Sequence, residues 1–169
     1  FLTAIQIPAG SPGNIVYSTY LGGSGNESAK GIAVAGGGRA GVDVYLAGWT
    51  ESHDFPVSQG AWRPRHGGGQ TDAFAVRINL HNVVYITAGP NPLAAISYAT
   101  FVGAESDDAA NGLVVDSTGA AYLTGYTRSS GFPTTRGSYQ PGHGGGAADA
   151  FVVKLNATGA LVFSTLFGG

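Results

Sequence analysis

Histidine and aspartate recur at matching positions in this chain, and these residue types could perform acid/base or metal chemistry. His66 precedes a run of three glycines and is followed six residues later by Asp72. His143 and Asp149 repeat this arrangement. An imidazole and a carboxylate at fixed spacing indicate either one acid/base or metal-ligand pair per copy, or a loop whose packing is repeated. No third ligand stands at a fixed spacing from them, so we favour repeated loop packing.

A pair of aromatic residues also corresponds between the two copies. Trp62 lies in Gly-Ala-Trp-Arg-Pro, and Tyr139 lies in Gly-Ser-Tyr-Gln-Pro. Aromatic rings on loops are amphipathic contact surfaces, so the pair is a candidate sugar-binding site. The alternative, which we favour, is that each ring anchors its own loop.

Three acidic residues, Glu105, Asp107 and Asp108, stand close together in the second copy. Carboxylate oxygens at close spacing are ligands that Ca²⁺ accepts. Their order matches neither the twelve-residue EF-hand loop nor a Gly-rich nonapeptide, so we interpret the cluster as a solvated turn. We therefore predict neither a metal nor another cofactor.

The sequence contains no recognisable catalytic set. It has no cysteine, no Gly-x-Ser-x-Gly elbow and no His-Glu-x-x-His motif, and no glycine run continues into Gly-Lys-Ser/Thr. We therefore assign no catalytic residues and predict that the protein is not an enzyme.

The composition is typical of short strands joined by glycine-rich turns. Glycine accounts for 29 of 169 residues, far above the usual share of about 7%, while 43% of the chain is hydrophobic. The net charge is −2 and no basic run occurs, which argues against nucleic-acid binding. No apolar stretch approaches the ~20 residues that span a bilayer, so no membrane-spanning segment is predicted.

An internal repeat organises the chain. Tyr-Ser-Thr-Tyr-Leu-Gly-Gly at 17–23 has counterparts at 98–104 and 163–169. Between these copies, Tyr-Leu-Ala-Gly-Trp-Thr at 45–50 matches Tyr-Leu-Thr-Gly-Tyr-Thr at 122–127, an offset of 77 residues that holds as far as Asn79. A constant offset over this length indicates repeated structural units.

Each unit contains four strand-like runs and no helical pattern. In the first unit these runs are 32–34, 44–49, 74–78 and 96–102. Two antiparallel hairpins per unit describe a four-stranded propeller blade, which must lie between neighbouring sheets to bury both faces. We therefore predict an all-β fold of β-propeller blades. A β-solenoid is less suitable because its coils are shorter.

The strand count predicts about two and a half blades. Residues 1–23 are expected to form the C-terminal half of a preceding blade, with 1–8 pairing with 15–23. Blade one is expected at 24–104, with insertions at 36–43 and 81–93, and blade two at 105–169. Closed propellers have about 4–8 blades, so the chain is expected to be part of a longer propeller, to close a ring with copies of itself, or to polymerise.

The motifs together resemble a known family. Tyr-Ser-Thr-Tyr-Leu-Gly-Gly, Gly-Ile-Ala-Val, Tyr-Leu-x-Gly-x-Thr, Phe-Pro, Gly-Gly-Gly and Asp-Ala-Phe follow one another as in the bacterial SBBP β-propeller repeat. The resemblance covers roughly residues 15–169 and departs at 36–43 and 81–93. It implies a module of extracellular or cell-surface proteins without enzymatic activity, and it carries over no catalytic residues.

The segment 81–92 has no counterpart in the second unit. Its run Val83, Val84, Tyr85 and Ile86 is apolar and β-prone, which predicts contact with a neighbouring subunit or domain. The expected function is a structural scaffold or self-assembly and protein-interaction surface, with further blades or copies of the same protein as partners. A glycan-binding propeller, and part of a propeller enzyme with its active site in a central channel, are the alternatives.

Overall fold

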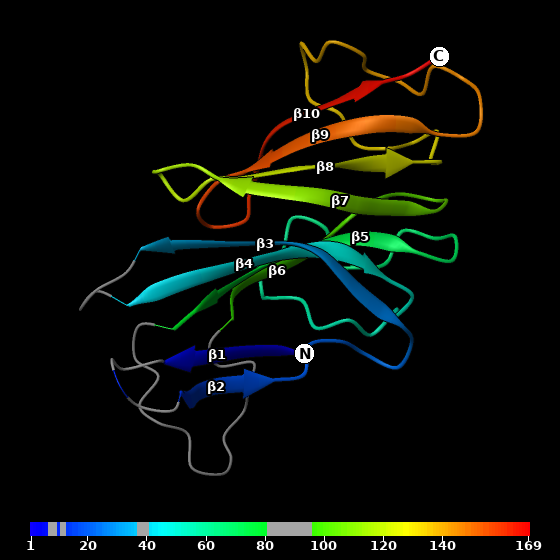
Figure 1. Ribbon diagram of the computed structural model, residues 1–169. Coiled ribbons are helices and arrows are strands. Elements are labelled where there is room, and N and C mark those ends of the chain that lie inside the picture. The colour runs from blue at the N-terminus through cyan, green and yellow to red at the C-terminus, as the bar shows by residue number, and fades with distance from the viewer. Residues whose placement is uncertain (7–9, 11–12, 37–40, 81–95) are drawn as a thin grey trace.

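The computed structural model describes residues 1–6, 10, 13–36, 41–80 and 96–169 (Figure 1). All regular elements of these residues are β-strands, as the sequence predicts, and no helix among them is long and apolar enough to cross a membrane. The predicted contact residues Val83, Val84, Tyr85 and Ile86 lie outside the described residues. The strands are β1 (Leu2–Gln6), β2 (Asn14–Thr19), β3 (Glu27–Gly36), β4 (Val42–Thr50), β5 (Asp72–Asn79), β6 (Ile96–Val102), β7 (Asp108–Val115), β8 (Ala121–Thr127), β9 (Asp149–Leu155) and β10 (Leu161–Phe167).

These strands form three antiparallel sheets in chain order. β1 pairs with β2, as the alternation in the first residues predicts. β3, β4, β5 and β6 form the first four-stranded sheet, and β7, β8, β9 and β10 form the second. The predicted insertion at 36–43 is partly strand, because Gly36 pairs with Val42 and so lengthens the β3–β4 hairpin.

Asparagine and aspartate side chains build the tight turns of the second sheet. Asp116 Oδ1 accepts hydrogen bonds from the N–H groups of Thr118 and Ala120. Gly119 completes this turn with a φ of 79°, which glycine adopts without steric cost. Asp116 and Gly119 thus form a tight turn between β7 and β8, which the Gly119 N–H closes by donating to the Asp116 carbonyl.

The sheets stack face to face in three layers, as Figure 1 shows. In each four-stranded sheet, the front face is the side directed toward the N-terminal layer, and the back face is the opposite side. Leu2 of β1 and Tyr17 of β2 pack on the front face of the first sheet, which carries Phe74, Val76 and Ile78. The back face of the first sheet, with Ala73 and Ala75, packs on the front face of the second, which carries Phe151, Val153 and Leu155.

A phenylalanine holds each long loop onto its sheet. Phe55 in the β4–β5 loop is buried and stacks on Phe74, with ring centroids 4.7 Å apart. Phe132 in the β8–β9 loop stacks on Phe151 at 4.9 Å. The phenylalanine of each Phe-Pro motif is therefore an apolar anchor for its loop. Because each loop is held in this way, the His and Asp residues that follow have fixed positions.

Candidate functional site

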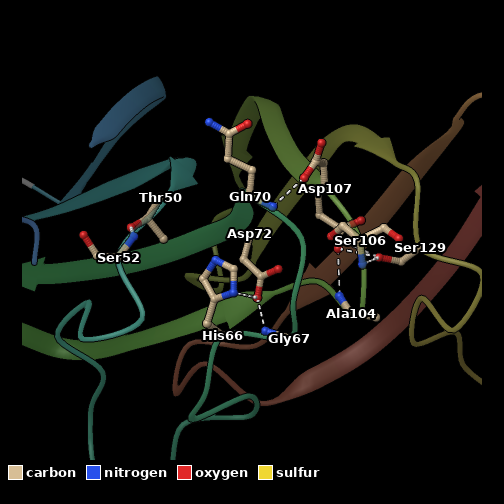
Figure 2. A network of polar contacts seen from close by, with 11 residues as sticks. Thr50, Ser52, His66, Gly67, Gln70, Asp72, Ala104, Ser106, Asp107 and Ser129 are labelled. Carbon is tan, nitrogen blue, oxygen red and sulfur yellow. Dashed lines mark hydrogen bonds and ion pairs between the residues drawn. The ribbon is translucent and has the colours of Figure 1, made fainter. Parts of the chain in front are cut away.

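Asp72 and Asp108 are buried aspartates at the junction of the two four-stranded sheets, and Figure 2 shows Asp72 there beside His66 and Gly67. Asp72 begins β5 in the first sheet, Asp108 begins β7 in the second, and both are fully buried. Gly103, just after β6, lies beside both: a Cβ placed there would be 2.8 Å from Asp72 Oδ1 and 2.6 Å from Asp108 Oδ2. The two carboxyl groups therefore share one small space at the junction.

Each carboxyl group has one oxygen that accepts hydrogen bonds and one that does not. Asp72 Oδ2 accepts from the Gly67 N–H at 2.5 Å. Asp108 Oδ2 accepts from the Ala104 N–H at 2.7 Å and the Ser129 hydroxyl at 2.9 Å. The Oδ1 atoms of both aspartates are buried without a hydrogen-bond partner among the described residues. Buried, unpaired carboxylate oxygens are costly, so the pair favours holding a proton.

The electrostatics of the junction agree with a bound proton. Burial raises the pKa of Asp72 to about 7, and the charge of Asp108 acts in the same direction, against the Gly67 N–H and Arg63. Burial also raises the pKa of Asp108, and Glu105 adds to this effect. Two carboxyl groups that share one space disfavour each other's charge, which is the direction in which Asp108 acts on the pKa of Asp72.

His66 packs beside this pair. Its Nδ1 lies 3.9 Å from Asp72 Oδ2, and its ring stacks on His53 with centroids 4.3 Å apart. Its other ring neighbour is Phe101, in an edge-on contact at 5.6 Å. Burial lowers the pKa of His66, so the imidazole is neutral at pH 7 and does not compensate the charge of Asp72.

The second unit repeats half of the arrangement. Asp149 Oδ2 accepts from the Gly144 N–H at 2.7 Å and from the Gln140 amide at 2.8 Å. His143 Nε2 lies 3.9 Å from Asp149 Oδ1. The His and Asp residues singled out in the sequence therefore come together within each unit, and the two units hold them in separate places.

The acidic cluster divides into surface residues and one buried residue. Glu105 accepts from the Ser130 hydroxyl at 2.7 Å and the Gly131 N–H, and these bonds lower the pKa of Glu105 to about 2. Asp107 Oδ1 accepts from the Gln70 N–H at 2.6 Å. The solvated-turn prediction is wrong for Asp108, because β7 starts at this residue and the first sheet covers it. Nowhere in the described parts of the chain do three or more His, Cys, Asp or Glu residues form a group that could hold a metal ion.

The two candidate sugar-binding aromatics have different surroundings. Trp62 packs against the core shared by the two four-stranded sheets and lines a hollow of about 340 Å³ together with Arg63 and Arg65. Tyr139 is 80% exposed and stacks on Phe167, with ring centroids 5.3 Å apart. Sugar binding by either ring stays a prediction.

Sequence reasoning missed that Asp72 and Asp108 meet. It paired Asp72 with His66 in one motif and grouped Asp108 with the acidic turn. One signal could have shown the connection: a glycine recurs at positions 22, 103 and 168, and an acidic residue follows the first two after five positions. A glycine repeated before a buried acid indicates that a second group approaches closely.

Replacing Gly103 with alanine is expected to destabilise the protein by about 2–4 kcal/mol, the cost of overpacking a buried site or breaking a buried polar network. The new methyl group would overlap both carboxyl groups, neither of which can leave its N–H donor without loss. Urea unfolding measures the change. Gly142→Ala is the control, since a Cβ at Gly142 meets nothing within 4 Å. Equal stability of the two variants would contradict the crowded junction.

The junction ties two sheets together through neighbouring loops. Ser129, after β8, donates its hydroxyl hydrogen to Asp108, while Ser106 donates its N–H to Ser129. Gln70, in the β4–β5 loop, donates its N–H to Asp107 at the start of the next unit. Such a set of contacts is suited to holding units together. Neither a protein-family model nor a curated protein matches this sequence, so the geometry of these residues is the basis for its role.

Proposed function

We propose that this protein is a non-enzymatic scaffold module of the β-propeller type, whose four-stranded blades stack face to face. The first and second four-stranded sheets are then two blades, and β1 and β2 are the outer strands of a preceding one. The antiparallel order of the sheets and their three-layer stack support this assignment. The resemblance of the motifs to the SBBP repeat adds an extracellular or cell-surface location to the proposal.

The coverage of the first sheet supports the interpretation of β1 and β2 as half a blade. On the front face, Val44 and Leu46 of β4 are buried beneath the β1–β2 layer. Their cross-strand neighbours on β3, Val34 and Ile32, are each 61% exposed. The N-terminal layer therefore covers the strands beyond β3 and leaves β3 open. Two further strands would be needed to cover β3, as in a complete blade.

The observation that carries the proposal is a difference in exposure between equivalent back-face residues. Tyr98 and Val102 of the first sheet are 2% and 0% exposed, because the second sheet covers them. Their counterparts in the second sheet, Phe163 and Phe167, are 37% and 45% exposed. The back face of the second sheet thus has the residues of a sheet-binding surface, and large exposed apolar patches mark interaction sites.

Polar contacts between the sheets indicate what kind of partner fits this surface. Arg77 on the covered back face donates to the Ala157 carbonyl at 2.6 Å, and the Tyr45 hydroxyl donates to the Gly119 carbonyl at 3.2 Å. Both acceptors lie in hairpin turns of the second sheet. On the exposed back face the equivalent residues are Lys154 and Tyr122. They can receive the two hairpin turns of an incoming sheet in the same way.

The partner is a further blade of this repeat with a free front face. In this chain β1 and β2 already cover much of the front face of the first sheet. A second copy would have to displace that layer before its first sheet could dock. A blade whose front face is free has no such obstacle, and its Phe, Val and Leu residues match the surface that the second sheet presents to the first.

Adding a blade is expected to bury the exposed face. In an extended chain, with residues 105–169 repeated once after Gly169, amide exchange of β10 should slow by at least tenfold. Burying Tyr139, Phe163 and Phe167 stabilises by about 1.5–3 kcal/mol per side chain. Hydrogen exchange resolved by residue measures the protection of 161–167.

Two substitutions in the extended chain separate docking from general stabilisation. Phe167→Asp in the first copy should return exchange in β10 to its original rate, because a charge would be buried between the sheets. Tyr20→Asp is the matched control, since Tyr20 is 88% exposed and directly follows β2. Unchanged exchange of β10 in the extended chain would show that the back face does not receive a blade.

A further inference from the structure

Three equivalent glycines mark the points where one unit ends and the next begins. Beside Gly103, in the middle of the chain, lie two carboxyl groups, Asp72 from the unit before and Asp108 from the unit after. Beside Gly22 lies the carboxyl group of Glu27, from the unit after it. Beside Gly168 lies that of Asp149, from the unit before it. The described ends of the stack therefore each carry one half of the arrangement that is complete at Gly103.

Asp149 reproduces the main contacts of Asp72, although its histidine faces Oδ1 instead of Oδ2. Both residues are buried at the start of the third strand of their sheet. Both accept at Oδ2 from the N–H of a glycine in the preceding loop, Gly67 or Gly144. The Oδ1 atom of each is buried without a hydrogen-bond partner among the described residues. At Asp72 this atom borders Gly103 together with the carboxyl group of Asp108, whereas at Gly168 the three nearest atoms all belong to Asp149.

Glu27 and Asp108 show what the other half looks like. Each begins the first strand of its sheet. Glu27 accepts from the hydroxyl groups of Thr50, at 2.8 Å, and Ser52. Asp108 accepts from Ser129, the counterpart of Ser52, at 2.9 Å. The acid at this position is thus built into each unit together with the hydroxyl groups that orient it.

We propose that Asp149 selects the incoming blade, by sharing one proton beside Gly168 with an Asp or Glu at the start of that blade's first strand. The inference rests on the proposed docking of a further blade on the second sheet. Asp149 Oδ1 has no hydrogen-bond donor among the described residues, so the shared proton is taken up from solvent as the blade docks. Docking is therefore favoured at low pH and becomes weaker as the pH rises and the shared proton is lost.

The pH dependence of docking also involves the titratable and charged groups that face the aspartates. At the complete junction, Asp72 is faced by His66 and Arg63, and Asp108 by Glu105. Asp149 is faced by His143 at 3.9 Å and by the neutral amide of Gln140. An incoming blade brings its own acid and the residue at the position of Glu105. Both are negative, so they raise the tendency of the junction to hold a proton.

The extended chain provides the test, with Asp149→Asn in the first copy as the key variant. We expect protection of its β10 residues 161–167 to be at least tenfold greater at pH 5.5 than at pH 8, after correction for intrinsic exchange rates. Asp149→Asn should keep the blade docked and remove this pH dependence, because the amide replaces the protonated acid. Asp108→Lys in the second copy should lower protection at both pH values. Potentiometric titration should find one proton fewer bound near pH 6.5 in Asp149→Asn.

The outcomes separate this inference from the proposed function. Equal protection at both pH values in the extended chain would overturn proton sharing and leave blade docking in place. No protection at either pH would overturn both. Protection that rises when Ca²⁺ is added at pH 8 would also overturn proton sharing, because a cation would then bridge the two carboxylates.

Discussion

Replacing Asp72 with asparagine is expected to stabilise the protein at pH 8 by about 2–4 kcal/mol, at 1.36 kcal/mol per pKa unit, and to leave its stability near pH 4 almost unchanged. The pKa of Asp72 is raised to about 7 in the folded protein, whereas the unfolded chain has the ordinary value of 3.8. Between these values the folded state binds a proton that the unfolded state does not. The free energy of unfolding of the native sequence must therefore fall as the pH rises from about 4 to about 7.

Asparagine removes this dependence because it resembles the protonated acid. Its carbonyl oxygen can accept from the Gly67 N–H, and its amide group replaces the second carboxyl oxygen beside Gly103 without carrying a charge. Urea unfolding at several pH values between 4 and 8 measures the two slopes. Asp108 contributes a further decrease in the same direction, since burial raises its pKa as well. A small residual slope in Asp72→Asn is therefore expected.

Asp149→Asn is the matched control in the native chain. Asp149 accepts from the same kind of glycine N–H and has a histidine at the same 3.9 Å distance. The three atoms nearest to a Cβ at Gly168 all belong to Asp149, whereas those at Gly103 come from both Asp72 and Asp108. This variant should therefore keep the slope of the native protein. Equal slopes for the native protein and Asp72→Asn would show that the pair at Gly103 does not hold the proton.

Much of the fold follows from local sequence because each unit repeats the same signals. The 77-residue offset predicts that two segments share one fold, and alternation predicts which side of a strand is apolar. The turn at Asp116 and the Phe55 and Phe132 plugs are also local features. Each depends on residues that are close in sequence or packed within one sheet, so the sequence was sufficient to predict them.

The carboxyl pair could not be found by comparing the copies. Comparison aligns Asp72 with Asp149 and Asp108 with Glu27, because those residues occupy the same place in their own units. The contact joins residues from different places in consecutive units, 36 positions apart, and exists only once the sheets stack. The same physics explains the error at Asp108, where a polar turn in sequence is covered by the neighbouring sheet.

The exposure of a residue also depends on whether another sheet is stacked on the face that carries it. Val102 and Phe167 have the same place in the repeat, yet one is buried and the other is 45% exposed. A repeat pattern describes the unit, and burial depends on whether another unit lies against it. Trp62 and Tyr139 differ for the same reason, so the exposure of Tyr139 is better explained by an uncovered sheet than by a sugar site.

The largest loss of stability is expected from Gly125→Ala, which should cost at least 4 kcal/mol and unfold most of the protein at 25 °C. Gly125 lies in β8 opposite Ala110, next to a shift in the β7–β8 register. A Cβ at Gly125 would overlap the Ala109 carbonyl oxygen and lie 2.8 Å from Ala110 Cα. Both obstacles are backbone, so no change of rotamer relieves them, and losses of this size come from strain of that kind.

Circular dichroism with and without a stabilising osmolyte measures the effect, since an osmolyte can restore the fold of a strongly destabilised variant. Gly137→Ala is the control because only the φ of 81° opposes alanine there, and a Cβ at Gly137 meets nothing within 4 Å. That change should cost only about 1 kcal/mol. Similar losses in the two variants would mean that the strands can separate to admit the methyl group.

Gly48→Ala should behave like Gly125→Ala, because Gly48 faces the Ser28 carbonyl and Ala29 Cα at the corresponding place in the first sheet. The glycine of the shared Tyr-Leu-x-Gly-x-Thr motif therefore permits the first two strands of each unit to approach closely at their irregular register. The first of these strands begins with the acid, Glu27 or Asp108. The second ends at Thr50 or Thr127, close to the hydroxyl groups that orient the acid. Because of this arrangement, a methyl group at either glycine should disturb both the sheet and the carboxyl group that joins it to the unit before.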